Sequence, residues 1–255
     1  MIRVAAAGDV HFGTESAGSL RPQLEHLPEL ADVLLLTGDL TRLGDPDEAE
    51  VLAKELRDVP IPVVAVLGNH DYHGEREGEV RAVLEDGGMT ILEGEGTVLE
   101  LNGERLGVAG TKGFGGGFVG ANATDFGEVE MKAFVLLTKA LSAKLEESLA
   151  ALDADYRVAL LHYAPIKETL VGEPPEIWAF LGSYLLGEAV DHAGADLILH
   201  GHAHRGTEKG ITPGGIHVRN VAQPVIQHAY RVYCLGGGDR GCEPVPSGSA
   251  TGRVG

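Results

Sequence analysis

The sequence has few of the features of a secreted disulfide scaffold or of a membrane protein. Cysteine occurs only twice in 255 residues, at Cys234 and Cys242, which is too few for a disulfide framework, so we expect free thiols. No apolar run approaches the length of a membrane span, and the opening residues lack the long apolar region and cleavage site of a signal peptide. These absences predict a cytoplasmic protein without a membrane partner.

Basic residues are also scarce. The chain carries 20 Lys and Arg residues against 38 Asp and Glu residues, which gives a formal net charge of −18. Nucleic-acid affinity comes largely from Lys and Arg side chains that neutralise phosphates, so we expect no nucleic-acid partner and favour a small substrate. An acidic surface could equally serve only to keep the protein soluble.

Short apolar runs indicate buried strands. Hydrophobic residues make up 44% of the chain and charged residues 23%, which is close to the average for folded globular proteins. Five continuous runs rich in Val, Leu, Ile and Ala have the length expected for strands buried on both faces. These runs are IRVAAA (2–7), DVLLLT (32–37), PVVAVL (62–67), YRVALL (156–161) and ADLILH (195–200).

Segments with helical spacing alternate with these runs, and the alternation predicts an α/β fold with crossover connections. The expected helices are Ser19–Leu27, Pro46–Arg57, Glu75–Asp86, Phe126–Leu152 and Ser183–His192. A second group of expected strands supplies the remainder of a two-sheet core: Thr90–Leu92, Thr97–Leu101, Arg105–Ala109, Ile216–Asn220 and Tyr230–Cys234. We expect one domain over residues 1–235, followed by a tail, 236–255, that is rich in Gly, Pro and Ser.

Polar clusters follow the carboxyl ends of the five apolar runs. In chain order, the clusters contain Asp9 and His11, then Asp39, then Asn69, His70 and Asp71, then His162, and last His202 and His204. The carboxyl ends of strands in an open α/β sheet form the edge where ligands bind, so these residues are expected to converge in one site.

The types of these residues favour a metal centre. Two carboxylates, one amide and four imidazoles can bind a metal: Asp9, His11, Asp39, Asn69, His162, His202 and His204. Nitrogen and oxygen ligands without sulfur point to Mn, Fe, Zn or a similar ion rather than to a structural zinc site. Seven ligands are too many for one catalytic ion, whereas two ions that share a bridging carboxylate would each keep room for water. The charge of such a pair suits a phosphate ester.

The ordered set DVH, GD, GNHD, H and GHAH resembles the calcineurin-like metallophosphoesterase superfamily over residues 9–204. The resemblance implies a two-sheet β-sandwich flanked by helices and two divalent transition-metal ions, with Mn favoured and Fe or Zn as alternatives. It implies one metal at Asp9, His11, Asp39 and His204, and the other at Asp39, Asn69, His162 and His202. It also implies that His70 protonates the leaving group and that Asp71 orients His70.

We therefore expect a metal-dependent phosphoesterase that hydrolyses phosphodiester bonds of small substrates through a metal-bridging hydroxide. A phosphomonoesterase, including a protein phosphatase, is the nearest alternative. The net charge disfavours a nuclease, and the intact ligand set disfavours a catalytically silent binding scaffold. Two segments stay open at this stage. The loop Gly110–Phe118 either faces substrate or is merely flexible, and residues 166–184 form a lid, a part of the core or an oligomer contact. The sequence leaves the oligomeric state open.

Overall fold

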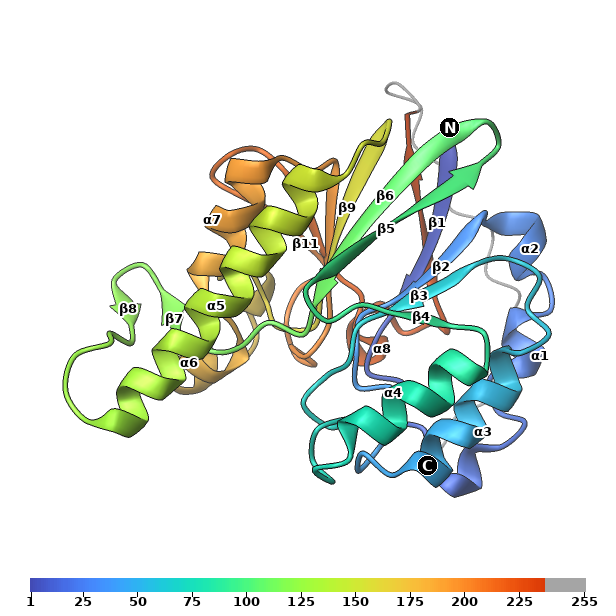
Figure 1. Cartoon of the computed structure of the whole chain (residues 1–255), viewed down its shortest axis with the longest axis horizontal. Coiled ribbons are helices and arrows are strands. Elements are labelled where there is room, and N and C mark those ends of the chain that lie inside the picture. Colours follow the sequence, from blue (N-terminus) through green and yellow to red (C-terminus); the bar gives the residue numbers. More distant parts are fainter. Residues whose placement is uncertain (237–255) are drawn as a thin grey trace.

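Two mixed β-sheets form the centre of the molecule, and helices cover their outer faces (Figure 1). A computed structural model of the chain describes residues 1–236, so the expected tail from residue 237 onward lies outside the described residues. The mixed α/β architecture with two main sheets confirms the fold that the alternation of apolar runs and helical segments predicts.

The first sheet has five strands in the order β13-β1-β2-β3-β4. Strands β1 to β4 run parallel, and β13 pairs antiparallel with β1 at the edge. The bounds are β1 (Ile2–Ala7), β2 (Val33–Leu36), β3 (Val63–Ala65), β4 (Thr90–Ile91) and β13 (Arg231–Leu235). Parallel pairing brings the carboxyl ends of β1, β2 and β3 to one edge of this sheet.

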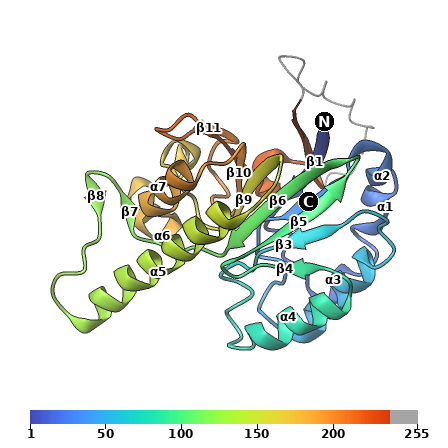
Figure 2. The same cartoon turned by 45° about the horizontal axis from the view of Figure 1, so that its top comes forward.

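The second sheet has six strands in the order β11-β12-β10-β9-β6-β5. Its four central strands run parallel, and β5 and β11 are antiparallel at the edges. The bounds are β5 (Glu95–Leu101), β6 (Glu104–Thr111), β9 (Tyr156–Leu161), β10 (Leu197–His200), β11 (Lys209–Ile211) and β12 (His217–Asn220). A small ribbon of β7 (Gly117–Phe118) and β8 (Ala121–Asn122) stands apart from both sheets, as Figure 2 also shows.

Four longer helices lie on the outer faces. Helices α3 (Pro46–Leu56) and α4 (Glu77–Asp86) pack together beside the first sheet, and α5 (Val129–Ala151) and α7 (Tyr184–Ala193) pack together beside the second (Figure 1). Helix α3 begins where the Asp45 side chain accepts a hydrogen bond from the Asp47 N–H, an N-cap that its sequence favours. The short elements are η1 (Thr14–Ser16), α1 (Arg21–Leu24), α2 (Leu27–Leu30), η2 (Glu168–Leu170), η3 (Pro175–Ile177), α6 (Trp178–Leu181) and α8 (Gln223–Ile226).

The single helix expected over Ser19–Leu27 is wrong. The structure has two four-residue helices there, α1 and α2, each with a proline in its first turn, Pro22 and Pro28. A proline removes a backbone donor and clashes with the carbonyl four residues earlier, so a helix begins at such a residue more readily than it continues through it.

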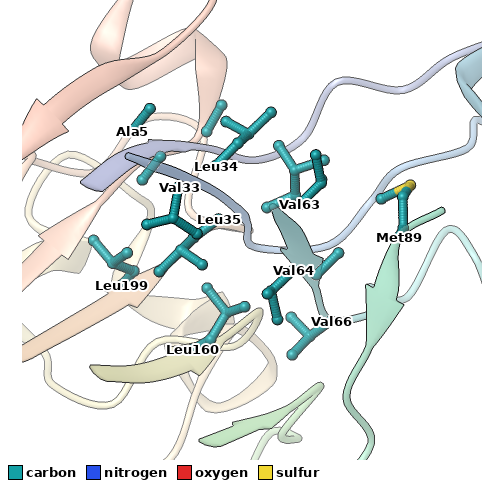
Figure 3. Close-up of a cluster of buried hydrophobic side chains, with 14 of the residues drawn as sticks. Ala5, Val33, Leu34, Leu35, Val63, Val64, Val66, Met89, Leu160 and Leu199 are labelled. Atoms are coloured by element: carbon teal, nitrogen blue, oxygen red, sulfur yellow. The ribbon is translucent and has the colours of Figure 1, made fainter. Parts of the chain in front are cut away.

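The core lies between the sheets and under the helices. Figure 3 shows Leu35 and Val64 of the first sheet in the same buried cluster as Leu160 and Leu199 of the second. The neighbouring residues Leu161 and Ile198 belong to another cluster, which packs α5 and α7 against the outer face. Successive side chains of β9 and β10 therefore enter different cores, which explains why these strands are apolar throughout.

The structure corrects one further expectation and bears on a second. Cys234 in β13 forms a disulfide bond, so the expected free thiol at this position is wrong. Within residues 1–236, none of the helices combines the length and the apolar character needed to cross a bilayer.

Candidate functional site

Residues from five strand ends meet at one edge of the sandwich. Ligand atoms of Asp9, His11, Asp39 and His204 all lie within 4.8 Å of one another, and so do those of Asp39, His162 and His202. We call these two sets the first and second ligand groups. The structure thus brings the sequence-predicted ligands together, and the Asp39 carboxylate belongs to both groups.

Glycines let the strand ends approach so closely. A Cβ atom at Gly68 would lie 2.1 Å from Asp39 Oδ1, and one at Gly201 would lie 2.3 Å from Asp9 Oδ2. Only glycine leaves room for these carboxylates, because real Cβ atoms essentially never come within 3.0 Å of another heavy atom. The glycines of GNHD and GHAH are therefore needed for the geometry of the site.

Four of the candidate ligands have an unusual backbone conformation. The φ angles of Asp9, His11, Asp39 and His202 are 58°, 45°, 50° and 69°, in the left-handed region that non-glycine residues rarely adopt. Such strain costs about 1–3 kcal/mol per residue and persists where the surrounding structure holds it, most often at functional sites. The turns after β1, β2 and β10 therefore hold candidate ligands in a strained conformation that directs their side chains.

The first ligand group is organised around Asp9. The buried Asp9 carboxylate accepts hydrogen bonds from the His202 N–H at 3.0 Å and from His204 Nε2 at 2.8 Å. His11 Nε2 lies 3.9 Å from Oδ2 of Asp39, the second carboxylate of the group. Two imidazole nitrogens and two carboxylates therefore face one small volume.

The second ligand group contains His162, which is fully buried. Its Nδ1–H donates to the Thr37 carbonyl at 2.8 Å, so Nε2 carries the lone pair of the neutral ring. That nitrogen lies 2.9 Å from Asn69 Oδ1 and 3.3 Å from Asp39 Oδ1. The structure thereby adds the Asn69 amide to the second group.

These contacts fit a cation. His162 Nε2, Asn69 Oδ1 and Asp39 Oδ1 are all electron-pair donors, and with the His162 proton on Nδ1 none of these three atoms carries a hydrogen. A buried meeting of acceptors is unfavourable unless a positive charge lies among them. The nitrogen and oxygen donors, together with the sharing of Asp39, indicate a dinuclear site for divalent ions.

Burial opposes charge on these side chains. It raises the pKa of Asp9 to about 6 and lowers the pKa of His11 to about 4 and that of His202 to about 3. The pKa of His204 is raised, mainly because its ring donates a hydrogen bond to Asp9. Metal ligands must be deprotonated, so bound divalent ions would keep both carboxylates ionised and the imidazoles neutral.

His70 lies at the mouth of the site, with 40% of its side chain exposed. Its Nδ1–H donates to the Arg42 carbonyl at 2.7 Å, and its Nε2 lies 4.0 Å from Asp39 Oδ2. The His70 N–H also donates to Asp39 Oδ1 at 2.8 Å. The other ring nitrogen, Nε2, therefore faces the shared carboxylate.

Asp71 does not orient His70 in the expected way. Its carboxylate is fully buried and accepts four hydrogen bonds, from the N–H groups of Leu40, Thr41 and Gly68 and from the Thr41 hydroxyl, at 2.6–3.1 Å. The His70 ring is held instead through Nδ1, which pairs with the Arg42 carbonyl. Asp71 instead ties the turn after β2 to the turn after β3.

The loop Gly110–Phe118 is packed into the molecule. Apart from the half-buried Phe114, all its residues are buried, and the N–H groups of Gly116 and Gly117 donate to the carbonyls of Ala179 and Gly182. A phosphate cradle would need such N–H groups to be free, and a merely flexible connection would not be buried. The loop instead supports the segment above it and leaves Lys112 as its charged residue near the site.

The segment 166–184 touches the second ligand group. The Phe180 carbonyl lies 3.4 Å from His202 Nε2, and the Arg205 N–H donates to Glu173 Oε1 at 2.7 Å. Trp178 is half-buried and packs against a small buried cluster that includes Leu170. The segment therefore lies beside the candidate metal centre.

Several groups that shape the site carry no signal in the sequence. The Thr37 and Arg42 carbonyls set the tautomers of His162 and His70, and every residue has a carbonyl. Tyr163, whose ring centroid lies 4.4 Å from that of His202, follows His162 directly and could have been found from that position.

A family model and several solved structures match the chain. A model of the calcineurin-like phosphoesterase family matches residues 2–206. The phosphopantetheinyl hydrolase PptH from Mycobacterium tuberculosis has a TM-score of 0.64 at 15% identity, with 96% of this chain and 97% of that chain covered. The protein TT1561 of Thermus thermophilus has a TM-score of 0.52 at 19% identity, with 86% of this chain and 88% of that chain covered.

A putative 5′-nucleotidase from Staphylococcus aureus has a TM-score of 0.57 at 15% identity, and the match covers 91% of this chain but 51% of that chain. At these identities the likeness shows the fold alone. The comparison with curated proteins gave no match.

Proposed function

The chain belongs to the calcineurin-like phosphoesterase family, and on that premise we propose that it is a dinuclear metal-dependent phosphodiesterase of small substrates. The observation that carries the proposal is the position of Asp39. Its carboxylate belongs to both ligand groups and lies beside the free ring nitrogen of His70.

The two ligand groups would hold the ions. Asp9, His11, Asp39 and His204 would bind one, and Asp39, Asn69, His162 and His202 would bind the other. When bound, two divalent ions supply Lewis-acid stabilisation of phosphoryl charge and make water acidic enough to act as a nucleophile near neutral pH. We propose Mn²⁺ first, with Fe or Zn²⁺ as alternatives, since the donors are nitrogen and oxygen without sulfur.

His70 supplies the proton for the leaving group. The Arg42 carbonyl holds the ring by Nδ1–H, so a second proton can be carried only at Nε2, the nitrogen that faces Asp39. An alkoxide leaving group needs such a proton, whereas an activated aryl group needs little help. This placement supports a preference for alkyl phosphodiesters.

Asp71 contributes by position. Its four hydrogen bonds fix the turn that carries Asp39 relative to the turn that carries Asn69 and His70. The distance between the shared ligand and the general acid depends on this connection. Asp71 is therefore a positioning residue in our proposal and makes no contact with substrate.

A substrate panel tests the proposal. The Mn²⁺-loaded protein is assayed against cyclic nucleotides, glycerophosphodiesters, nucleotide pyrophosphates and phosphomonoesters, with Asp39→Asn as the inactive control. We expect diesters to be hydrolysed faster than monoesters and Asp39→Asn to lose both activities. Release of inorganic phosphate from monoesters with diesters untouched would make the protein a phosphomonoesterase, and no hydrolysis of any ester would indicate a binding scaffold.

In this proposal, the cellular location of the protein is either the cytoplasm or an oxidising compartment. The sequence favours the cytoplasm, but a disulfide such as that at Cys234 is typical of oxidising compartments. Fractionation of cells with an antibody to the protein, together with thiol labelling of Cys234, decides between these locations.

A further inference from the structure

Lys112 continues the row of residues that forms the candidate metal centre. It follows β6, and β6 lies beside β9, which leads into His162, in the second sheet. The N–H groups of His162 and Tyr163 both donate to the Lys112 carbonyl, at 3.2 and 3.0 Å. Neighbouring strands lie about 4.8 Å apart, so Lys112 begins about one strand beyond the second ligand group.

The Lys112 ammonium makes neither a hydrogen bond nor a close ion pair in the described part of the chain, although the Glu93, Asp39 and Glu77 carboxylates attract it from farther away. The residue is only 9% exposed, and neither a hydrogen bond nor an ion pair of its Nζ is found among residues 1–236. Among residues 1–236, the side-chain nitrogen and oxygen atoms that are buried without a hydrogen-bond partner are Ser142 Oγ and Arg231 Nε. Lys112 Nζ is not one of them, so the tip of this largely buried side chain keeps access to solvent.

Three aromatic rings, which we call the aromatic cage, surround this ammonium. Lys112 Nζ lies 4.3 Å from the ring centroid of Tyr72, 5.1 Å from that of Phe114 and 5.8 Å from that of Tyr163. Cations within about 6 Å of an aromatic face are attracted to it, so the rings hold the ammonium without neutralising it. The Glu93, Asp39 and Glu77 carboxylates attract the ammonium from a distance, but within the described residues none of them is hydrogen-bonded to it, so its N–H groups can still donate to a bound anion.

The aromatic cage is fixed from both sheets. The Tyr72 hydroxyl donates to Glu93 at 2.8 Å, and the Leu67 N–H donates to the same carboxylate at 3.2 Å. The Tyr163 ring packs against His202, a member of the second ligand group. The aromatic cage is therefore built into the wall of the candidate metal centre.

We propose that Lys112, with Tyr72, Phe114 and Tyr163, forms a specificity subsite that binds a second anionic group of the substrate. The inference rests on the proposed function and deepens it. The scissile phosphate binds at the two ligand groups, and a phosphate or carboxylate farther along the same molecule reaches Lys112. The substrate class is then a small phosphate ester with a second negative charge, rather than one whose other groups are neutral.

Binding of non-hydrolysable phosphonates tests this subsite without relying on catalysis. Isothermal titration calorimetry of the Mn²⁺-loaded protein compares methylphosphonate with phosphonoacetate, 3-phosphonopropionate and 4-phosphonobutyrate, which add a carboxylate at increasing distances. Lys112→Met keeps the aliphatic stem within the aromatic cage and removes the charge. Lys54→Met, an equal change of charge at a side chain that is 64% exposed on α3, is the matched control.

We expect at least one carboxylate-bearing phosphonate to bind the wild type and Lys54→Met roughly 10- to 100-fold more tightly than methylphosphonate, as a hydrogen bond to a charged group provides. Lys112→Met should lose this preference and keep its affinity for methylphosphonate. Thermal unfolding checks that each variant is folded. If Lys112→Met is not folded, Lys112→Gln takes its place.

Two results would overturn the subsite: no preference in the wild type, or a preference that survives in the Lys112 variant. Failure of all four phosphonates to bind would instead remove the phosphate site on which both proposals rest. Tight and selective binding without any hydrolysis of esters would retain the subsite and refute only the proposed enzyme.

Discussion

Gly68→Ala should disable the metal centre, because Gly68 lies against the shared ligand. The new Cβ would lie 2.1 Å from Asp39 Oδ1 and 2.3 Å from the Asp39 N–H nitrogen, whereas ordinary contacts begin at 3.4 Å. The Asp39 carboxylate or the Gly68 backbone must therefore move by about 1 Å, a displacement that can cost about 100-fold in rate. We also expect a loss of about 1–3 kcal/mol in the free energy of unfolding from overpacking.

Gly78→Ala is the matched control. Gly78 lies in α4, and a Cβ there meets no atom within 4 Å, so the same substitution should stabilise the protein by about 0.5–1 kcal/mol. Urea unfolding measures the stabilities, and calorimetry with Mn²⁺ measures metal affinity, which should fall by about 10- to 100-fold in Gly68→Ala alone. If Gly68→Ala bound two ions as tightly as Gly78→Ala does, the close approach of Asp39 to Gly68 would be refuted.

Three further predictions concern the neighbouring residues and the substrate. Asp71→Ala should lower the free energy of unfolding by about 2–4 kcal/mol, because it leaves three buried N–H groups without a partner. The surface control Asp58→Ala should change it by less than about 1 kcal/mol. Equal stabilities of the two variants in urea would contradict the positioning role of Asp71. His70→Ala should keep its metals, and its steady-state rate of alkyl diester hydrolysis should fall roughly 10²–10⁴-fold. Its rate with nitrophenyl diesters should fall much less. Equal losses with both substrates would exclude proton donation by His70. Long DNA and RNA should be cleaved more slowly than small diesters at physiological salt, because the net charge of −18 repels a polyanion. Faster cleavage of the nucleic acids in a nuclease assay would refute this prediction.

The convergence of the site could be predicted from the sequence, because both of its causes are local. Buried parallel strands leave continuous apolar runs, and the polar residue after each run marks the carboxyl end of a strand. Asp9, Asp39 and His162 are far apart in the chain, yet each follows such a run. The sheets then bring these ends to one edge, as the structure shows.

The partners of each ring could not be predicted in this way. The family resemblance implies that Asp71 orients its neighbour His70, but the turn directs the Asp71 carboxylate to the N–H and hydroxyl groups of Thr41. His70 pairs instead with a carbonyl, a group that every residue carries and that leaves no mark in the sequence. Tertiary geometry alone decides between these partners.

The surroundings of Lys112 show the same limit. The sequence leaves open whether this glycine-rich loop faces substrate or is flexible, whereas the structure buries the loop and places Lys112 over the ring of Tyr72. Tyr72 follows a strand of the other sheet and lies 40 positions earlier in the chain. No local pattern relates two such residues.

Anomalous diffraction from crystals of the Mn²⁺-loaded protein shows directly whether Asp39 is shared by two metal ions. We expect two manganese peaks per chain, one on each side of the Asp39 carboxylate, with His162 and Asn69 at one ion and Asp9 and His204 at the other. A single peak, or peaks away from Asp39, would contradict the dinuclear centre.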